Sequence, residues 1–409
     1  MLFQEQKDRE PRQGATAPDA TASPRTLAII DLDNLRHNLR ILRQAARGAE
    51  IMAVVKADAY GHGAIPIART LAADGVSHFA VATLHEALEL RSAGINQYIL
   101  VFNPPFQDEL PLYFNHRLDV SVTSSAVADQ ILRAAREGMT LRVHVKVDTG
   151  MHRLGVALHE AASCINALVR TAGVQVAGVW THFATAQNRP DAFVREQLER
   201  FNALLPSLDG RPGCIHTANS AALLSVPGSM AFDAPVMARP GIALYGLLEN
   251  PDDIPQFGLK PVMTLRSHIQ HLQVVEAGES VSYGRTWTAA EATRVATIGA
   301  GYADGFRRAL SNRGRVGVAG GRAPIVGNVC MDMFMISLGG TEVGQAGESI
   351  GDPVVLFGEE GPSAAEVAQW MGSIPHEVCS GISQRVPRLY VRSEEDAGGA
   401  SDASEPDFL

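Results

Sequence analysis

The fold of this chain is decided by the stretch AVVKADAYGHG, which runs from Ala53 to Gly63. An apolar run from Ile51 to Val55 predicts a short buried strand, and Lys56 follows it at once. Apolar surroundings lower the pKa of a lysine amine and free its lone pair to attack a carbonyl carbon, as a Schiff-base lysine requires. An ordinary lysine whose stem lies along the strand end fits the same residues, so both interpretations stay open on this stretch alone.

Short apolar runs alternate with amphipathic segments over residues 27–258, which predicts strands separated by helices. The predicted strands are Ile51–Lys56, His78–Thr83, Tyr98–Phe102, Asp119–Val122, Leu141–Asp148, Val174–Phe183, Cys214–Asn219 and Pro235–Tyr245. The predicted helices are Ile65–Ala73, Leu84–Ala93, Ser124–Glu137, His159–Thr171 and Asp191–Leu205. Strands alternating with helices indicate a parallel sheet, and their number closes a (β/α)₈ barrel of the TIM type. A doubly wound open sheet is the alternative; reactive residue types after several strand ends favour the barrel.

Around Leu259 the pattern changes to short alternating runs rich in Val, Ile and Thr, separated by Gly and Pro turns, which predicts a mainly β domain. The predicted strands are Met263–Val275, Arg294–Gly299, Gly314–Val318, Ala323–Val326, Phe334–Ser337 and Pro353–Phe357. One short helix, Ser363–Met371, begins with a capping-box pattern. The predicted organisation is a disordered tail (1–26), the barrel (27–258), the β domain (259–392) and an acidic disordered tail (393–409).

Composition narrows the class of protein. A chain of 409 residues with 46% hydrophobic and 19% charged residues is typical of a soluble protein of two domains. No apolar run approaches the ~18–20 residues that span a bilayer, and the N-terminus lacks the apolar core of a secretory signal, so we expect a cytoplasmic protein without a membrane partner. The four cysteines match no metal or redox spacing, which predicts reduced thiols and no metal site.

The net charge of −9 comes largely from the end of the chain, because Ser393–Leu409 holds six acidic residues and no Lys or Arg. The remainder is nearly balanced. A broad basic face is therefore not expected, which argues against a nucleic-acid partner.

The segment around Lys56 resembles the cofactor-lysine motif of alanine racemases, and six further segments resemble that family in the same order. They are VKVDTGMHRLG (Val145–Gly155), WTHFA (Trp180–Ala184), HTANSAA (His216–Ala222), ARPGIALYG (Ala238–Gly246), VSYGRTW (Val281–Trp287) and GYADGF (Gly301–Phe306) with NVCMDM (Asn328–Met333). The resemblance covers residues 26–392 and rests on seven matches in order. It implies a homodimeric enzyme that uses pyridoxal 5′-phosphate to interconvert L- and D-alanine, a small amino-acid substrate, and so supplies D-alanine for peptidoglycan.

Racemisation removes a proton from one face of a carbon and returns it to the other, so two bases are needed. The resemblance implies that Lys56 binds the cofactor and serves one face, while Tyr283 serves the other. A free tyrosine has a pKa of ~10 and needs a cationic neighbour to work near neutral pH. By resemblance Arg153 lies between Tyr283 and the substrate carboxylate. Lys146 matches a position that is carbamylated in several family members; a carbamate would pair with Arg153, whereas an unmodified lysine would repel it.

The resemblance also implies the cofactor site. Tyr60, Ser220 and the turn Gly241-Ile242 would bind phosphate, because a hydroxyl and exposed amides at a helix start suit an anion. A plain helix cap is the alternative for Ser220.

Arg239 would donate to the ring nitrogen of the cofactor. A guanidinium with a pKa above ~12 does not give up its proton, so the ring would stay a weak electron sink and transamination would be suppressed. A surface arginine before a turn is the alternative for Arg239. His182 would pack near the ring, and a hydrogen-bonded core histidine fits it equally.

Tyr302 and Met331 lie in the predicted β domain with Tyr283. In the family this domain reaches the barrel of the other subunit, so the three residues would complete the partner's site. One position departs from the pattern: Gln384 stands where many members carry a tyrosine that binds phosphate and narrows the entrance. This change predicts weaker cofactor retention or a roomier pocket that admits serine. A second change, Gln187, is expected to lie outside the chemistry.

Other functions share parts of this pattern. A serine or broad-specificity racemase of the same fold is motivated by Gln384. A basic amino-acid decarboxylase shares the barrel and cofactor but needs no second base. A non-catalytic carrier of the cofactor is usually a lone barrel, and the second domain with Tyr283 argues against it.

Overall fold

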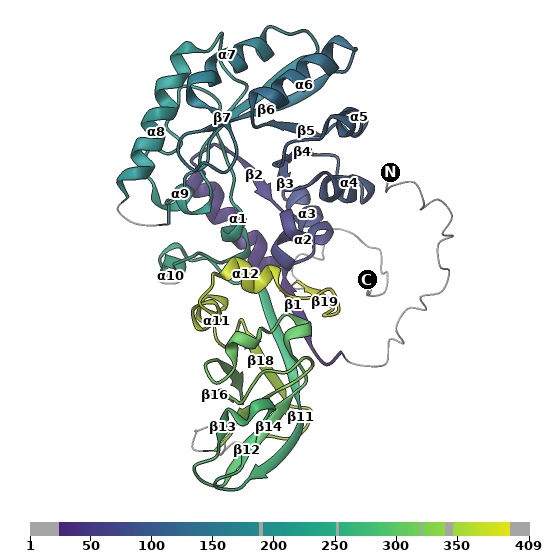
Figure 1. The fold of residues 1–409 in the computed structure, drawn as a ribbon, viewed down its shortest axis with the longest axis vertical. Coiled ribbons are helices and arrows are strands. Elements are labelled where there is room, and N and C mark those ends of the chain that lie inside the picture. The colour runs from purple at the N-terminus through teal and green to yellow at the C-terminus, as the bar shows by residue number, and fades with distance from the viewer. Residues whose placement is uncertain (1–23, 188–190, 251–252, 320, 340–346, 393–409) are drawn as a thin grey trace, which may run out of the picture.

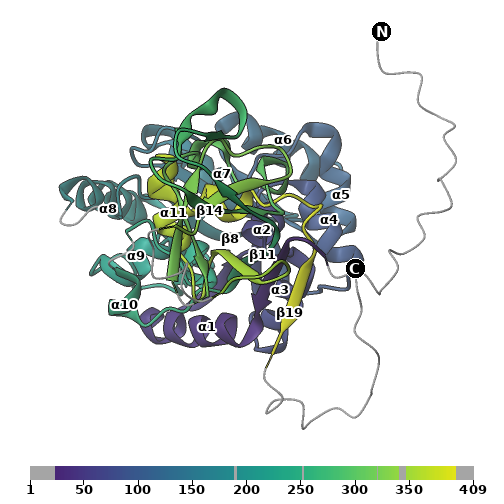
Figure 2. The same ribbon diagram turned by 90° about the horizontal axis from the view of Figure 1, so that it is seen from below.

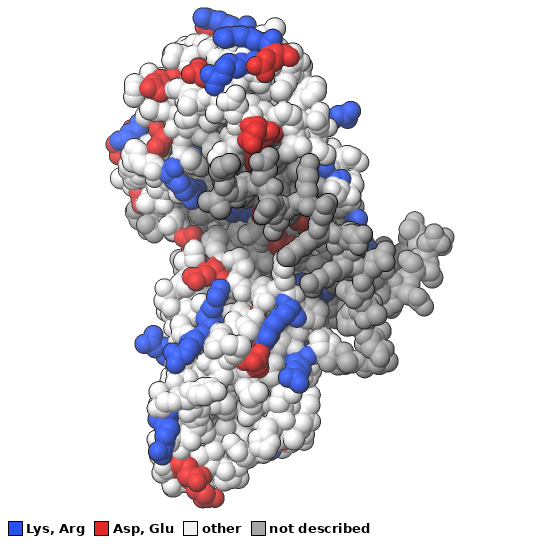
Figure 3. All heavy atoms as spheres, turned by 45° about the vertical axis from the view of Figure 1, so that its right-hand side comes forward, with Lys and Arg blue, Asp and Glu red and all other residues white. Residues whose placement is uncertain are grey.

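The computed structural model describes residues 24–187, 191–250, 253–319, 321–339 and 347–392, which form two lobes (Figure 1). The predicted disordered tails lie outside the described residues, apart from residues 24–26. Within the described part of the chain, no helix is long and apolar enough to cross a membrane. On the face drawn in Figure 3, acidic and basic side chains are interspersed over both lobes.

The upper lobe is a parallel barrel. Its strands are β2 (Glu50–Val54), β3 (His78–Val81), β4 (Tyr98–Val101), β5 (Asp119–Val122), β6 (Leu141–Asp148), β8 (Val174–Trp180), β9 (Ile215–His216) and β10 (Met237–Ala238), with β7 (Val156–Ala157) beside β6. The sheet order is β10-β2-β3-β4-β5-β6-β8-β9, and a parallel bridge between Ile215 and Val236 closes the ring. The predicted (β/α)₈ barrel is confirmed, and the open-sheet alternative is wrong.

Helices surround this barrel (Figure 1). They are α1 (Leu32–Ala46), α3 (Ala64–Ala73), α4 (Leu84–Ser92), α5 (Leu110–Asn115), α6 (Ser125–Arg136), α7 (Leu158–Val169), α8 (Ala192–Leu204), α9 (Ser220–Ser225) and α10 (Asp253–Phe257). The prediction omitted α1, although its Leu35, Leu39 and Leu42 form a buried stripe at helical spacing.

The lower lobe is a mainly antiparallel sheet. Its order is β14-β17-β16-β15-β18-β11-β1-β19, and β14 also pairs with β11. The strands are β1 (Leu27–Asp31), β11 (Met263–Val275), β14 (Thr293–Ile298), β15 (Arg315–Val318), β16 (Gly321–Val326), β17 (Phe334–Ser337), β18 (Pro353–Phe357) and β19 (Arg388–Val391), with a separate ribbon of β12 (Ser280–Val281) and β13 (Trp287–Thr288). The first strand of the chain lies here, because β1 pairs with β11 and β19. The prediction that placed residues 27–31 with the barrel is therefore wrong for this strand.

The two lobes meet at the carboxyl ends of the barrel strands. The predicted helix is α11 (Ala364–Met371), and a second helix that the prediction missed, α12 (Pro375–Ser380), follows it and lies beside the segment after β2. The hydroxyl of Tyr390 on β19 donates to the carbonyl of His62 at 3.1 Å. Seen from the end of the lower lobe, the barrel helices extend around the smaller β domain (Figure 2). The β domain therefore supports the mouth of the barrel in the same chain.

Candidate active site

Lys56 begins a left-handed turn. The segment labelled α2 (Lys56–Gly61) contains four consecutive residues, Ala57 to Tyr60, with φ between 52° and 55°. Left-handed backbone costs an L-residue about 1–2 kcal/mol, so this turn persists only because its surroundings hold it. The next glycine is required by a close approach, since a Cβ on Gly61 would lie 2.2 Å from the carbonyl oxygen of Cys379. The turn places the Lys56 amine 5.9 Å from the centre of the Tyr60 ring.

A cavity of about 520 Å³ opens at this end of the barrel. Its volume lies within the range of about 300–1,000 Å³ that is usual for small-molecule sites. The predicted residues that line it are Lys56, Tyr60, Lys146, Arg153, His182, Ser220, Arg239, Gly241 and Ile242. One chain therefore gathers the predicted cofactor site in a single cavity.

One end of the cavity is built to donate hydrogen bonds. The Ser220 hydroxyl accepts from the amides of Gly241 (2.9 Å) and Ala243 (3.2 Å), which leaves its own proton free to donate. The side chain of Asn219 caps α9, so the alternative that Ser220 is a plain cap is wrong. A Cβ on Gly241 would lie 2.3 Å from the Tyr60 hydroxyl oxygen, so only glycine allows this approach. Burial raises the pKa of Tyr60, which keeps its hydroxyl protonated. These groups suit a phosphate.

Arg239 is buried, with 3% of its surface exposed, so the alternative of a surface arginine is wrong. Its Nη1 donates to His216 Nδ1 at 3.0 Å, and its Nη2 donates to the carbonyls of Thr181 (2.7 Å) and Thr217 (3.3 Å). His182 Nδ1 lies 3.4 Å from the same Nη2. Every hydrogen bond that the described residues make to the guanidinium group of Arg239 uses Nη1 or Nη2. The Nε–H group is left to face an acceptor in the cavity, such as a pyridine nitrogen.

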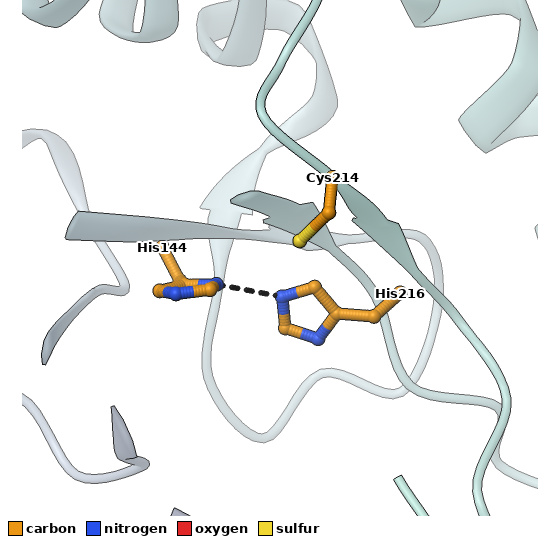
Figure 4. A group of neighbouring side chains, drawn as sticks. All are labelled: His144, Cys214 and His216. Carbon is orange, nitrogen blue, oxygen red and sulfur yellow. Dashed lines mark hydrogen bonds between the residues drawn. The ribbon is translucent and has the colours of Figure 1, made fainter. Parts of the chain in front are cut away.

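Behind Arg239 a chain of hydrogen bonds runs through His216 and His144 to Asp119, and Figure 4 shows the bond between the two histidines. His216 Nε2 lies 2.9 Å from His144 Nδ1, and His144 Nε2 lies 3.1 Å from Asp119 Oδ2. Because a guanidinium only donates, His216 must accept at Nδ1, donate from Nε2, and so make His144 donate to Asp119. Both rings are therefore neutral, and burial lowers the pKa of His216 well below its usual range, with the charge of Arg239 acting in the same direction. The relay holds Arg239 in place.

His144, Cys214 and His216 also form a group whose possible metal-ligand atoms lie within 4.8 Å of one another (Figure 4). The bond from Arg239 leaves the proton of His216 on Nε2, which then has no lone pair for a metal. Burial raises the pKa of the Cys214 thiol to about 11, so the sulfur is not a thiolate at neutral pH. Hydrogen bonding accounts for the two histidines, and Cys214 is a buried, protonated thiol beside them.

Two lysines and two arginines make the cavity strongly cationic. The Lys146 amine lies 4.9 Å from the centre of the Trp180 ring, and the Arg239 guanidinium carbon lies 4.7 Å from the same centre. Burial, then Arg153 and Arg239, lower the pKa of Lys146 to about 8. Burial and then Arg153 also lower the pKa of Lys56. Both amines are therefore more readily deprotonated, and more nucleophilic, than a lysine in water.

Three predicted site residues lie elsewhere. Tyr283, Met331 and Tyr302 do not line the cavity and are exposed by 77%, 53% and 40%. Tyr283 follows β12, which lies at the far end of the β domain from α2 (Figure 1). A single chain does not bring these side chains to Lys56.

Comparisons with known proteins agree with this geometry. The family models for the alanine racemase N-terminal domain and C-terminal domain match residues 30–249 and 262–390. The chain belongs to the alanine racemase family. Curated alanine racemases of Chlorobaculum tepidum and Geobacter sulfurreducens are 41% and 42% identical to it; the alignments cover 89% and 90% of this chain and 95% and 97% of those proteins.

Solved structures of alanine racemases share the fold. Alanine racemase from Streptomyces lavendulae superposes with a TM-score of 0.83 at 37% identity, over 92% of this chain and all of that one (100%). Biosynthetic alanine racemase from Pseudomonas aeruginosa gives the same TM-score, 0.83, at 36% identity, over 90% of this chain and 100% of that one. The predicted family and fold class are confirmed.

Sequence reasoning about this alanine racemase family member missed several lining residues. Trp180 and Asn219 stand inside the quoted motifs at strand ends, so position could have identified them, whereas His376 and Ile374 enter from the β domain without a local signal. Gln187 also lines the cavity, and the expectation that it lies outside the chemistry stays a prediction. The exposed Gln384 is not among the lining residues.

Proposed function

We propose that this chain interconverts L- and D-alanine with pyridoxal phosphate held in the barrel cavity. The observation that carries the proposal is the convergence in one cavity of the Lys56 amine, the Nε–H of Arg239 and the hydroxyls of Tyr60 and Ser220. The residues fit the cofactor: the hydroxyls and the Gly241-Ile242 turn would hold phosphate, Arg239 would donate to the ring nitrogen, His182 would pack beside the ring, and Lys56 would bind the aldehyde. When bound, pyridoxal phosphate spreads the charge of a deprotonated substrate carbon into its ring.

The chain's own groups then move the proton. The lowered pKa of Lys56 makes its Nζ available as a base on one face of the substrate carbon. The phenol oxygen of the partner subunit's Tyr283 exchanges a proton on the opposite face, and Arg153 holds the substrate carboxylate. Because Arg239 does not give its proton to the ring, the ring would be a weaker electron sink, more of the charge would remain on the substrate carbon, and return of the proton to that carbon would dominate.

The site is proposed to be complete only in a homodimer. Tyr283, Tyr302 and Met331 are exposed on neighbouring segments of the β domain: Asn328 Nδ2 donates to the Tyr283 carbonyl at 2.6 Å, and the Tyr302 amide donates to the Cys330 carbonyl at 3.0 Å. An exposed aromatic and apolar face fits the open mouth of another barrel. In the dimer Tyr302 and Met331 would border the substrate.

We further propose that Lys146 carries a carbamate. Its lowered pKa provides neutral amine that can attack CO₂, forming an N–C bond and releasing one proton, and the anion formed would pair with Arg153. A carbon-13 spectrum of protein equilibrated with labelled bicarbonate should show one carbamate resonance that is lost in Lys146→Ala.

One experiment tests the activity. The purified protein should show the visible absorbance of lysine-bound cofactor, and incubation with either enantiomer of alanine should reach an equal mixture by chiral chromatography. No racemisation of either alanine enantiomer by cofactor-loaded dimer would overturn the proposal. L-serine is compared in parallel because Gln384 replaces the family's tyrosine. A higher kcat/KM for serine than for alanine would make serine the preferred substrate. Supply of D-alanine for peptidoglycan in the cytoplasm follows from this activity as a proposal.

A further inference from the structure

The left-handed turn after Lys56 is held by a carboxylate that lies outside the cavity lining. Glu86, in the first turn of α4, accepts from the Ala57 amide through Oε1 at 2.6 Å. Its Oε2 accepts from the amides of Ala82 at 2.7 Å and Thr83 at 3.0 Å. One side chain therefore joins the residue directly after Lys56 to the end of the neighbouring barrel strand.

Helix capping alone does not account for these contacts. Glu86 forms a capping box with Thr83, and such a box needs one bond from the glutamate to the N-cap amide. The same box occurs at α11, where Glu366 accepts from the Ser363 amide at 2.7 Å. Glu366 gives its other oxygen to Arg322, whereas Glu86 gives its other oxygen to the backbone of the strained turn. The two glutamates are thus a matched pair that differ in what they hold.

The hydrogen bond from the Ala57 amide to Glu86 lies at the first residue of the turn that has left-handed backbone angles. At Ala57 φ is 53° and ψ is 52°. The other end of the turn is tied by Ala59 donating to the Val55 carbonyl at 2.9 Å and by the Asp58 carboxylate accepting from Ala64 at 2.6 Å. Release of the Glu86 bond would leave the Ala57 amide without this partner, inside the loop that the bond from Ala59 to Val55 closes around Lys56.

We propose that Glu86 is a positioning residue for Lys56: its carboxylate holds the left-handed turn so that the lysine amine faces the cofactor aldehyde. This inference rests on the role of Lys56 proposed above. The charge of Glu86 also acts on the amine. Arg153, His182 and His376 face Lys56 from the loop after β6, the end of β8 and α12, and Glu86 is the acid that raises the pKa of Lys56 against burial and Arg153.

Glu86→Gln tests both effects, because the amide has one acceptor oxygen and turns an NH₂ group toward backbone donors. In cofactor-free protein we expect the Kd for pyridoxal phosphate, followed by the absorbance of lysine-bound cofactor, to rise at least tenfold. The pH midpoint of binding should fall, since the Lys56 pKa loses a stabilising charge. Glu366→Gln is the matched control and should lower Tm similarly while leaving the Kd and the pH midpoint of wild type.

A rescue variant separates positioning from general stability. Ala57→Gly removes the Cβ that makes left-handed backbone costly, so adding it to Glu86→Gln should recover at least threefold of the lost affinity. Should Glu86→Gln not fold, Glu86→Asp keeps the charge, shortens the reach to Ala57, and should weaken binding without lowering the pH midpoint. Equal affinity and equal pH midpoints in Glu86→Gln and Glu366→Gln would overturn the inference. Wild-type protein that bound no pyridoxal phosphate at Lys56 would instead overturn the proposed function.

Discussion

The mouth of the barrel and the exposed face of the β domain differ in how far one chain completes them. At the barrel mouth, buried groups from several strand ends converge on a single cavity and bond to one another. On the β-domain face, Tyr283, Tyr302 and Met331 lie open to solvent. The proposed cofactor-binding half of the site is thus preorganised by folding, whereas the proposed second base requires another subunit.

Of the substitutions that test the two regions, replacing Lys56 at the barrel mouth has the largest expected effect on activity. Lys56→Ala removes the nucleophile and one proton carrier, so kcat should fall on the order of 10⁴-fold or more. The visible absorbance of lysine-bound cofactor should disappear. Lys260→Ala, which changes a lysine outside the cavity, should keep both properties. Retention of the absorbance by Lys56→Ala would refute its assignment.

Tyr283→Phe tests the other region. Loss of one base should lower kcat by about 10²–10⁴-fold while the cofactor absorbance stays unchanged. Mixing Lys56→Ala with Tyr283→Phe and allowing subunits to exchange should restore about a quarter of wild-type activity. About half of the dimers would be hybrids, and each hybrid holds one intact site out of two. Without recovery in hybrids shown to form, Lys56 and Tyr283 would not act across the dimer.

The pH dependence of stability sharpens the contrast, because histidines buried in the neutral state gather at the barrel mouth. Burial lowers the pKa of His62 to about 4 and that of His216 well below 6.5. Below pH ~6.5 each histidine is protonated in the unfolded chain but stays neutral in the folded one. Its contribution to the free energy of unfolding is therefore fully present above pH ~6.5 and is lost as the pH falls. The free energy of unfolding in urea should therefore decrease from pH 6.5 toward 4, by at most about 1.4 kcal/mol per unit for each histidine.

His62→Asn provides the control for this titration. Its amide can replace the Nδ1 donor to the Ala59 carbonyl without a titrating group. In this variant the free energy of unfolding should decrease less steeply between pH 6.5 and 4, by the contribution of one histidine. An unchanged slope would assign the acid sensitivity to other groups.

Gln384→Tyr gives the smallest expected effect. Because Gln384 is exposed and does not line the cavity of its own chain, the ratio of kcat/KM for alanine to that for serine should change by no more than about twofold, as for a surface substitution. Parallel kinetics on both substrates measure this ratio. A much larger change would show that residue 384 borders the substrate and would favour the serine alternative.

Local pattern was sufficient for most of the barrel. Its eight strands and five of its helices follow from apolar runs and helical spacing, and Lys56, Ser220 and Arg239 follow strands whose ends share one edge. Local pattern failed for β1, which none of the predicted strands covers: it lies in the range assigned to the barrel but pairs with β11, more than two hundred residues away. It also failed for His376, whose place in the cavity depends on how α12 packs against the barrel.

The sequence by itself determined the fold class and the reactive residue types, because both depend on hydrophobic period and on side-chain chemistry. Only the tertiary structure decided which groups hold the reactive residues in place. These are the relay from Asp119 to Arg239, the left-handed turn at Lys56, and the hydrogen bond from that turn to Glu86. These features join residues from different strands and helices, and their hydrogen bonds and pKa values depend on burial and distance. Burial and distance between residues far apart in the chain do not follow from local sequence pattern.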